Sequence, residues 1–232
     1  MPWNEPVGPI LVWSAATIAL YALAKTICRR WSQWWLTPLT LTPALLIALM
    51  LALHASYGDY SRGVRWLAAL LGPATVAFAI PIYRQRALIL RRWPVLAIGV
   101  VAGSATAMTT AWGLASVLGL DGALRLSLLP RSMSTPFAMT VSGDIGGAPD
   151  LTAFFVIVTG VFGAALGEVL LQWLPVRSAM ARGALFGMGA HAVGVAKAHQ
   201  IGGEEGSIAG VILVLVGLVN VLAAPLLALW LR

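Results

Sequence analysis

Long apolar runs separated by short polar segments occupy nearly the whole chain. Each run holds about 20 residues, and a helix of that length crosses the roughly 30 Å hydrocarbon core of a bilayer. The pattern therefore predicts an all-α, polytopic membrane protein with about six full spans. The predicted spans are residues 8–26, 35–54, 64–82, 94–118, 151–174 and 206–231.

Two further segments, 125–150 and 182–203, are too polar and glycine-rich for ordinary spans, yet too hydrophobic for plain loops. We predict that each is a re-entrant hairpin or a broken helix. Irregular backbone at membrane depth must be buried in protein or line a watery cavity, because unpaired backbone polar groups in lipid cost several kcal/mol each. These two segments are therefore the expected location of the functional chemistry.

The distribution of basic residues favours re-entrant hairpins over full crossings. If both segments are hairpins, both termini face outward, the two hairpins enter from opposite faces, and most basic residues lie in the cytoplasm. That bias is much weaker if both segments cross. The cytoplasmic residues would be Lys25, Arg29, Arg30, Arg84, Arg86, Arg91, Arg92, Arg177 and Arg182, against Arg62, Arg65, Arg125 and Arg232 outside.

Composition agrees with a membrane protein: 59% of the 232 residues are hydrophobic and 10% are charged. An average soluble domain is roughly 45–50% apolar and 25% charged. We expect a single membrane domain over residues 1–232, with possible repeat halves at 64–150 and 151–231. The net charge of +7 does not indicate nucleic-acid binding, because the basic residues form no exposed stripe for phosphates.

The first polar segment contains the stretch LLPRSMSTPFAMTVSGDIGGAPD, which begins at Leu128. Pro130 and Pro136 are predicted to break a helix there. Pro136 lacks an N–H group and disfavours helix at the preceding residue, but it fits the first turn of a new helix. Ser134 or Thr135 is then expected to cap that new helix.

A helix that begins inside the protein offers free N–H groups and a positive dipole end to a carboxylate or phosphate oxygen. The hydroxyls of Ser132, Ser134 and Thr135 lie beside this predicted start, and Arg131 adds a cation that can bind a carboxylate through two hydrogen bonds. These residues are candidates for substrate binding. The alternative is an interfacial loop in which Arg131 extends toward the lipid headgroups.

In the second polar segment, Gly187, Gly189 and Gly194 are predicted to loosen the helix around His191. A histidine at such a break can donate to an anionic substrate or take up a coupling proton. The alternative is a packing histidine bonded to a neighbouring carbonyl. Lys197 is a second candidate cation, although a lysine near a helix end more often extends to the interface.

Two acidic residues, together with Lys197, form a second tier of candidates. Glu168 lies within a predicted span, where an acid is a functional hypothesis by default, and it follows Gly163 and Gly167, which favour tight helix packing. Because Trp173 marks the nearby interface, contact of Glu168 with water is an equal alternative. Asp144 lies at the expected exit of the first hairpin, where a turn is the ordinary explanation.

Motifs for other chemistries are absent from the sequence. It holds no Walker loop, no HExxH, no nucleophile elbow and no Cys/His metal spacing. We therefore expect no enzymatic activity, no cofactor and no metal site. The small residues around Ser104 are interpreted as a helix contact, and Asn220 as an interhelical hydrogen bond.

Three sequence blocks resemble the signature blocks of the LrgB/CidB family: Leu70–Arg86, Leu128–Gly167 and Arg182–Ala198. The resemblance runs from about residue 8 to the C-terminus. It implies a multi-pass protein of the bacterial inner membrane, encoded beside a smaller LrgA/CidA-like membrane partner. We also expect a homo-oligomer, with a dimer favoured.

The resemblance implies two candidate functions. Family members are described as antiholin-like modulators of murein hydrolase export and lysis, whereas a plastid relative translocates glycolate and glycerate and bacterial members have been linked to small carboxylates such as pyruvate. We therefore expect a secondary transporter of small monocarboxylates, with an antiholin-like oligomer as the alternative. The family often has Lys at the position of Arg131, and hydroxyl residues at the positions of Ala190 and Val195, so the exact substrate is open.

Overall fold

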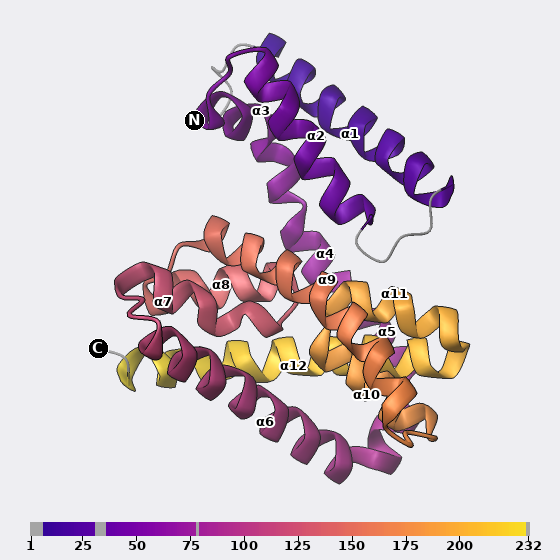
Figure 1. Cartoon of the computed structure of the whole chain (residues 1–232). Coiled ribbons are helices and arrows are strands. Elements are labelled where there is room, and N and C mark those ends of the chain that lie inside the picture. The colour runs from indigo at the N-terminus through magenta and orange to yellow at the C-terminus, as the bar shows by residue number, and fades with distance from the viewer. Residues whose placement is uncertain (1–6, 31–35, 78, 231–232) are drawn as a thin grey trace. The chain divides into compact units, whose positions relative to one another are not determined.

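The computed structural model describes residues 7–30, 36–77 and 79–230, and these contain helices and loops but no strand (Figure 1). The prediction of an all-α fold is confirmed. The helices are α1 (Val7–Arg30), α2 (Pro38–Ala52), α3 (Tyr57–Ala69), α4 (Leu71–Ala77), α5 (Ala79–Arg84), α6 (Arg86–Val117), α7 (Gly122–Leu128), the 3-10 helix η2 (Leu129–Ser132), α8 (Thr135–Ile145), α9 (Pro149–Trp173), α10 (Ala179–Gly189), α11 (His191–Ile201) and α12 (Gly203–Trp230).

Four helices of the described chain, α1, α6, α9 and α12, are long and apolar enough to cross a membrane. Four of the six predicted spans are therefore supported. The predicted span 35–54 contains the 15-residue helix α2, about 22 Å long, and the predicted span 64–82 is interrupted at Leu70, between α3 and α4. Pro73 lies in the first turn of α4, a position that suits the start of a new helix.

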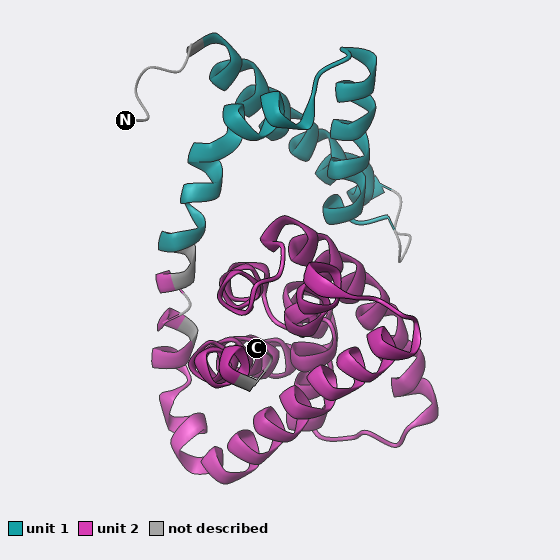
Figure 2. Cartoon of the chain, turned by 90° about the vertical axis from the view of Figure 1, so that its left-hand side faces the viewer, with its two compact units in different colours: residues 1–74 teal, residues 75–232 magenta. Residues whose placement is uncertain are grey.

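Residues 1–74 form one compact unit, in which α1 packs against α2 and α3 (Figure 2). Gly63 of α3 lets the helices approach closely, because a Cβ there would lie 2.8 Å from the Cβ of Trp13. The Ser14 hydroxyl donates to the Gly63 carbonyl at 3.2 Å and accepts from the Trp66 indole N–H at 2.7 Å. Aromatic and small polar side chains thus hold α1 to α3.

Residues 75–232 form the second unit, with α12 at its centre. This helix packs against α5, α6, α8, α10 and α11, and it is the most buried of the four apolar helices. The main hydrophobic core of the unit lies between α12, α8 and α6 and includes Met133, Phe137, Ile208 and Val216. Helix α9 packs against α7, η2 and α8 as well as α10 and α11. Both of the polar segments therefore contact α9 and α12.

Each polar segment folds as a pair of short helical arms. Helices α8, α10 and α11 have 11 residues each, and α7 with η2 spans a similar length. An arm of 11 residues is about 16 Å long, roughly half of a bilayer core. In the second pair the arms pack tightly, because a Cβ on Gly194 would collide with the carbonyl of Phe186. The broken helices are observed, while their re-entrant placement, the single membrane domain and the repeat halves stay predictions.

Hydrogen bonds made by hydroxyl groups connect the first pair of arms to the start of α9. The buried Thr152 hydroxyl contacts the Ser142 hydroxyl at 2.7 Å and the Ser127 carbonyl at 3.0 Å. The Ser127 hydroxyl accepts from the Ala148 N–H at 2.8 Å. A Cβ on Gly147 would lie 2.5 Å from the Ser142 hydroxyl, so only glycine fits there. The Ser, Thr and Gly residues of this segment therefore join α7, α8 and α9.

Candidate functional site

The first helix break lies between η2 and α8. Met133 and Ser134 have extended backbone angles there, Pro130 lies in the first turn of η2 and Pro136 in the first turn of α8. Each proline thus lies where a helical segment begins. Ser134 occupies the N-cap position, but its side chain makes no capping hydrogen bond, and Thr135 is already helical. Because Pro136 has no N–H group, one of the donors that a capping side chain normally binds is missing.

The second helix break lies between Ala190 and His191. His191 has a φ angle of 46°, in the left-handed region that non-glycine residues rarely adopt. The predicted glycines act beside this break: a Cβ on Gly187 would lie 2.5 Å from the Ala209 carbonyl, and Gly194 meets the α10 backbone as described above. Gly187 thus allows α10 to pack closely against α12, and Gly194 allows the two arms to pack together, whereas nothing lies within 4 Å of a Cβ on Gly189. The interruption itself falls on His191.

The second break rests against the middle of α9. A Cβ on Gly163 would collide with the carbonyl of Gly189, and a Cβ on Gly160 would lie 3.4 Å from both the Ala190 carbonyl and His191 Nδ1. The glycines of α9 therefore allow the break between α10 and α11 to pack directly against this helix. This packing buries the His191 side chain to 2% exposure.

Three predicted polar residues have no partner in the described part of the chain. The Ser134 hydroxyl and His191 Nε2 are buried without a hydrogen bond, and the half-buried Arg131 makes neither a hydrogen bond nor an ion pair there. Native proteins rarely leave buried polar atoms unsatisfied, since each costs about 1–3 kcal/mol. Both helix breaks thus contribute unpaired polar groups, as a site for a polar ligand requires.

The two remaining candidates for substrate binding lie beside the first helix break. Ser132 ends η2 and Thr135 begins α8, and both are half-buried. Ser132 lines a small cavity, whereas Arg131, Ser134 and His191 are not among the residues that line it. At the first break, Ser132 therefore faces the cavity, whereas Arg131 and Ser134 do not.

The second-tier residues have local partners or exposed positions. Lys197 of α11 forms an ion pair with Glu168 of α9, which neutralises both and joins the second pair of arms to α9. Asp144 is exposed in the last turn of α8, two residues before Gly146, whose φ of 90° ends the helix. A helix-ending turn explains the Asp144 position.

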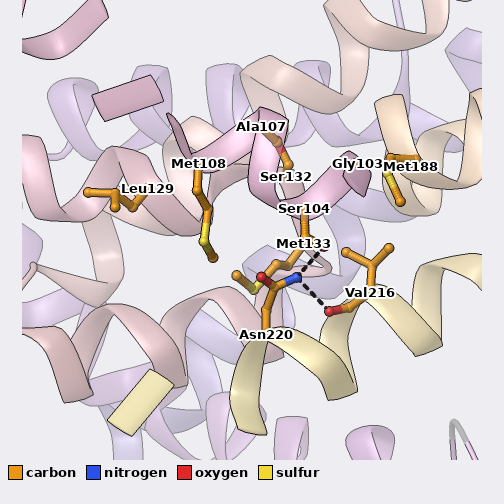
Figure 3. A pocket seen from close by; sticks show the side chains of 10 residues that line it. All are labelled: Gly103, Ser104, Ala107, Met108, Leu129, Ser132, Met133, Met188, Val216 and Asn220. Carbon is orange, nitrogen blue, oxygen red and sulfur yellow. Dashed lines mark hydrogen bonds between the residues drawn. The ribbon is translucent and has the colours of Figure 1, made fainter. Parts of the chain in front are cut away.

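The sequence analysis missed the cavity beside the first break, at the middle of α12 (Figure 3). Asn220 is buried there and donates through Nδ2 to the Ser104 hydroxyl at 2.9 Å and to the Val216 carbonyl at 2.7 Å. The interhelical hydrogen bond was predicted, but its place in a cavity was not. The cavity is lined by Gly103, Ser104, Ala107, Met108, Leu129, Ser132, Met133, Met188, Val216 and Asn220.

Comparison with known proteins decides the family. A model of the LrgB-like family matches residues 17–230. The chain belongs to the LrgB family. The uncharacterized protein YwbG of Bacillus subtilis strain 168 is 36% identical over 211 residues, covering 91% of this chain and 94% of that protein.

Relatives with a descriptive name extend this assignment. The antiholin-like protein LrgB of B. subtilis strain 168 is 38% identical over 189 residues, 82% of each chain. The antiholin-like protein LrgB of Bacillus mycoides strain KBAB4 is 33% identical over 190 residues, 82% of this chain and 83% of that protein. No solved structure matches the chain. The resemblance to the LrgB/CidB family is thus confirmed, and with four apolar helices the chain is a membrane protein.

Proposed function

We propose that this LrgB-family protein is a secondary transporter of small monocarboxylate anions, bound between the two helix breaks. The observation that carries the proposal is the set of unpaired polar groups at the breaks: Arg131, the Ser134 hydroxyl and His191 Nε2. Broken helices that meet near mid-membrane are a recurrent way of building transporter sites.

An anion suits these groups better than a neutral or cationic ligand. The guanidinium of Arg131 can bind both carboxylate oxygens, and the Ser134 hydroxyl can donate to one of them. Helices α8 and α11 also begin at the two breaks, so that the positive ends of their dipoles lie there. His191 then serves as a donor to the anion or as the acceptor of a coupled proton.

Uptake of labelled glycolate and pyruvate into proteoliposomes tests the proposal. Arg131→Ala is expected to reduce uptake about 10- to 150-fold, because a charge-assisted hydrogen bond contributes about 1.5–3 kcal/mol. Arg91→Ala, which removes an exposed arginine from α6, is the matched control and should leave uptake unchanged. Absence of uptake above empty liposomes, with and without a small LrgA/CidA-like partner, would overturn the proposal.

The antiholin-like function is the second candidate, and the names of the two LrgB relatives favour it over carboxylate transport. It would involve an oligomer that modulates membrane permeability and murein hydrolase export. Dye release from liposomes that is equal for the wild type and Arg131→Ala, together with absent uptake, would support it. A homo-oligomer, the small membrane partner and the bacterial inner membrane are part of either proposal.

A further inference from the structure

Two exposed arginines lie at the junction where α5 ends and α6 begins (Figure 1). Arg84 is the last residue of α5 and Arg86 is the first residue of α6. Gln85 separates them and has backbone angles of φ −100° and ψ 15°, which interrupt the helix. The interruption therefore places two basic side chains at one corner of the chain.

Packing supports the backbone on both sides of this corner. Helix α5 contacts both α12 and α6. At the start of α6, Leu88 and Ile89 pack against the main hydrophobic core of the second unit. Because Arg84 and Arg86 are exposed, the corner presents their charges outward from a fixed backbone.

Tyr83 holds Arg86 in one orientation. The guanidinium carbon of Arg86 lies 4.4 Å from the centre of the Tyr83 ring, and Nη1 donates to the Tyr83 carbonyl at 3.1 Å. A guanidinium that is already stacked and hydrogen-bonded loses less side-chain entropy when its remaining N–H groups bind a ligand. Arg86 is thus an oriented donor beside the unrestrained Arg84.

No acidic side chain neutralises this corner. The sequence has no Asp or Glu between Asp59 and Asp121. Within the part of the chain that the structure describes, neither Arg84 nor Arg86 forms an ion pair. Both guanidinium groups therefore keep their full charge for an external anion.

Apolar side chains beside the arginines indicate that this anion belongs to a lipid. Ile80 lies four residues before Arg84 in α5, and Leu90 lies four residues after Arg86 in α6, so each shares a helix face with its arginine. Ile80 is 53% exposed and Leu90 is 74% exposed. The corner thus combines free positive charge with apolar surface, which matches a phosphate group attached to acyl chains.

We infer that Arg84 and Arg86, the latter oriented by Tyr83, form a binding site for the headgroup of an anionic phospholipid. Each guanidinium can bind two phosphate oxygens through parallel N–H groups. Basic residues next to a membrane span attract anionic headgroups, whereas the ammonium group of a zwitterionic headgroup opposes the guanidinium charges. The site is separate from the two helix breaks, and it does not depend on the proposed transport function.

Native mass spectrometry of the purified full-length protein in a neutral detergent tests the inference. Phosphatidylglycerol or phosphatidylcholine is added, and the lipid-bound fraction is measured at each concentration. The wild type should bind phosphatidylglycerol more tightly than phosphatidylcholine. Replacing both arginines, by Arg84→Gln with Arg86→Gln, should weaken phosphatidylglycerol binding about 30-fold, because each basic residue near an anionic surface contributes about a fivefold factor. Phosphatidylcholine binding should stay unchanged, which also reports that the variant is folded.

The orienting role of Tyr83 is tested in the same assay. Tyr83→Leu removes the ring under the Arg86 guanidinium and should weaken phosphatidylglycerol binding about two- to fivefold. Tyr83→Phe keeps the ring and should bind like the wild type. If the phenylalanine variant is as weak as the leucine variant, Tyr83 does not act by stacking on Arg86.

Arg91→Gln is the matched control for charge. It removes the same charge from an exposed position of α6, but Arg91 lies about 7.5 Å along the helix and about 140° around it from Arg86. Phosphatidylglycerol binding should therefore persist in this variant. Equal binding of the two lipids by the wild type, or equal losses in Arg91→Gln and the double variant, would overturn the inference. Displacement of phosphatidylglycerol by an equal concentration of inorganic phosphate would overturn a lipid as the occupant.

Discussion

At the scale of single residues, hydrogen-bonding capacity separates the structural polar groups from the candidate ligand groups. Ser127, Ser142 and Thr152 satisfy one another and the backbone around the turn at Gly147. Ser134 and His191 are equally buried but have an unpaired atom each. Hydroxyls a few residues apart in the sequence thus differ in whether they have hydrogen-bond partners.

The hydroxyl network yields a stability prediction. Thr152→Val keeps the side-chain shape but leaves the partners of the hydroxyl without their hydrogen bonds, so it should lower the free energy of unfolding by about 1–3 kcal/mol. Thr140→Val is the matched control, because the exposed Thr140 hydroxyl bonds only to the carbonyl of Pro136 in its own helix. Thermal unfolding in detergent measures both, and an equal shift in the two variants would contradict the account.

The positive charge at residue 131 is expected to contribute more to anion binding than the two-point geometry of the guanidinium, since the resemblance to the LrgB/CidB family implies that lysine can occupy this position. Arg131→Lys should therefore retain uptake within about tenfold of wild type, and Arg131→Ala should lose more. Initial rates of glycolate uptake over a range of concentrations distinguish the two. If the lysine variant is as inactive as the alanine variant, two-point binding of the carboxylate is required instead.

Sequence reasoning identified Arg131, Ser134 and His191 because polar residues beside helix-breaking residues are costly in a membrane. It did not identify the cavity at Asn220 and Ser104. Both residues have an ordinary local explanation, and 116 positions separate them along the chain. Only the packing of α6 against α12 brings them together.

At the scale of helices, glycine determines how close the broken tips come to the long helices. Gly163→Ala would place a methyl group against the Gly189 carbonyl, so it should displace the second break and reduce both thermal stability and uptake. Gly99→Ala in α6 is the control, because nothing lies within 4 Å of a Cβ there. It should be neutral or stabilising by about 0.5–1 kcal/mol. Equal behaviour of the two variants in unfolding assays would contradict this packing.

The ion pair between α9 and α11 predicts that Lys197 does not bind the ligand. Its charge is already paired with Glu168, and both side chains are partly exposed, so the pair contributes about 0–1 kcal/mol to stability. Lys197→Ala should therefore change the apparent affinity for glycolate less than threefold, about 0.6 kcal/mol. A tenfold loss in a competition assay would instead place Lys197 in the site.

Helix existence was predictable from apolar run length, and helix boundaries were not. The run at 94–118 is part of α6, which bends at Arg92, two residues before Pro94. The run at 64–82 has a continuous apolar composition but is interrupted between α3 and α4. Hydropathy measures the total burial of a segment in lipid, whereas proline and neighbouring helices decide where its backbone is interrupted.

At the scale of the whole molecule, residues 75–232 contain both helix breaks, the cavity and the central helix α12. The two pairs of short arms have similar lengths, and each is followed by a long apolar helix, α9 after the first and α12 after the second. This order is typical of transporters in which broken helices bind the substrate between longer helices. The first unit, α1 to α3, contributes none of the candidate site residues.

Equilibrium binding of labelled glycolate to the purified full-length protein tests the central claim most directly. Saturable binding by the wild type and by Arg91→Ala, with about a 10- to 150-fold weaker affinity in Arg131→Ala, is the predicted result. Equal affinity in the wild type and Arg131→Ala, or no saturable binding by any of the three proteins, would contradict a carboxylate site at the first helix break.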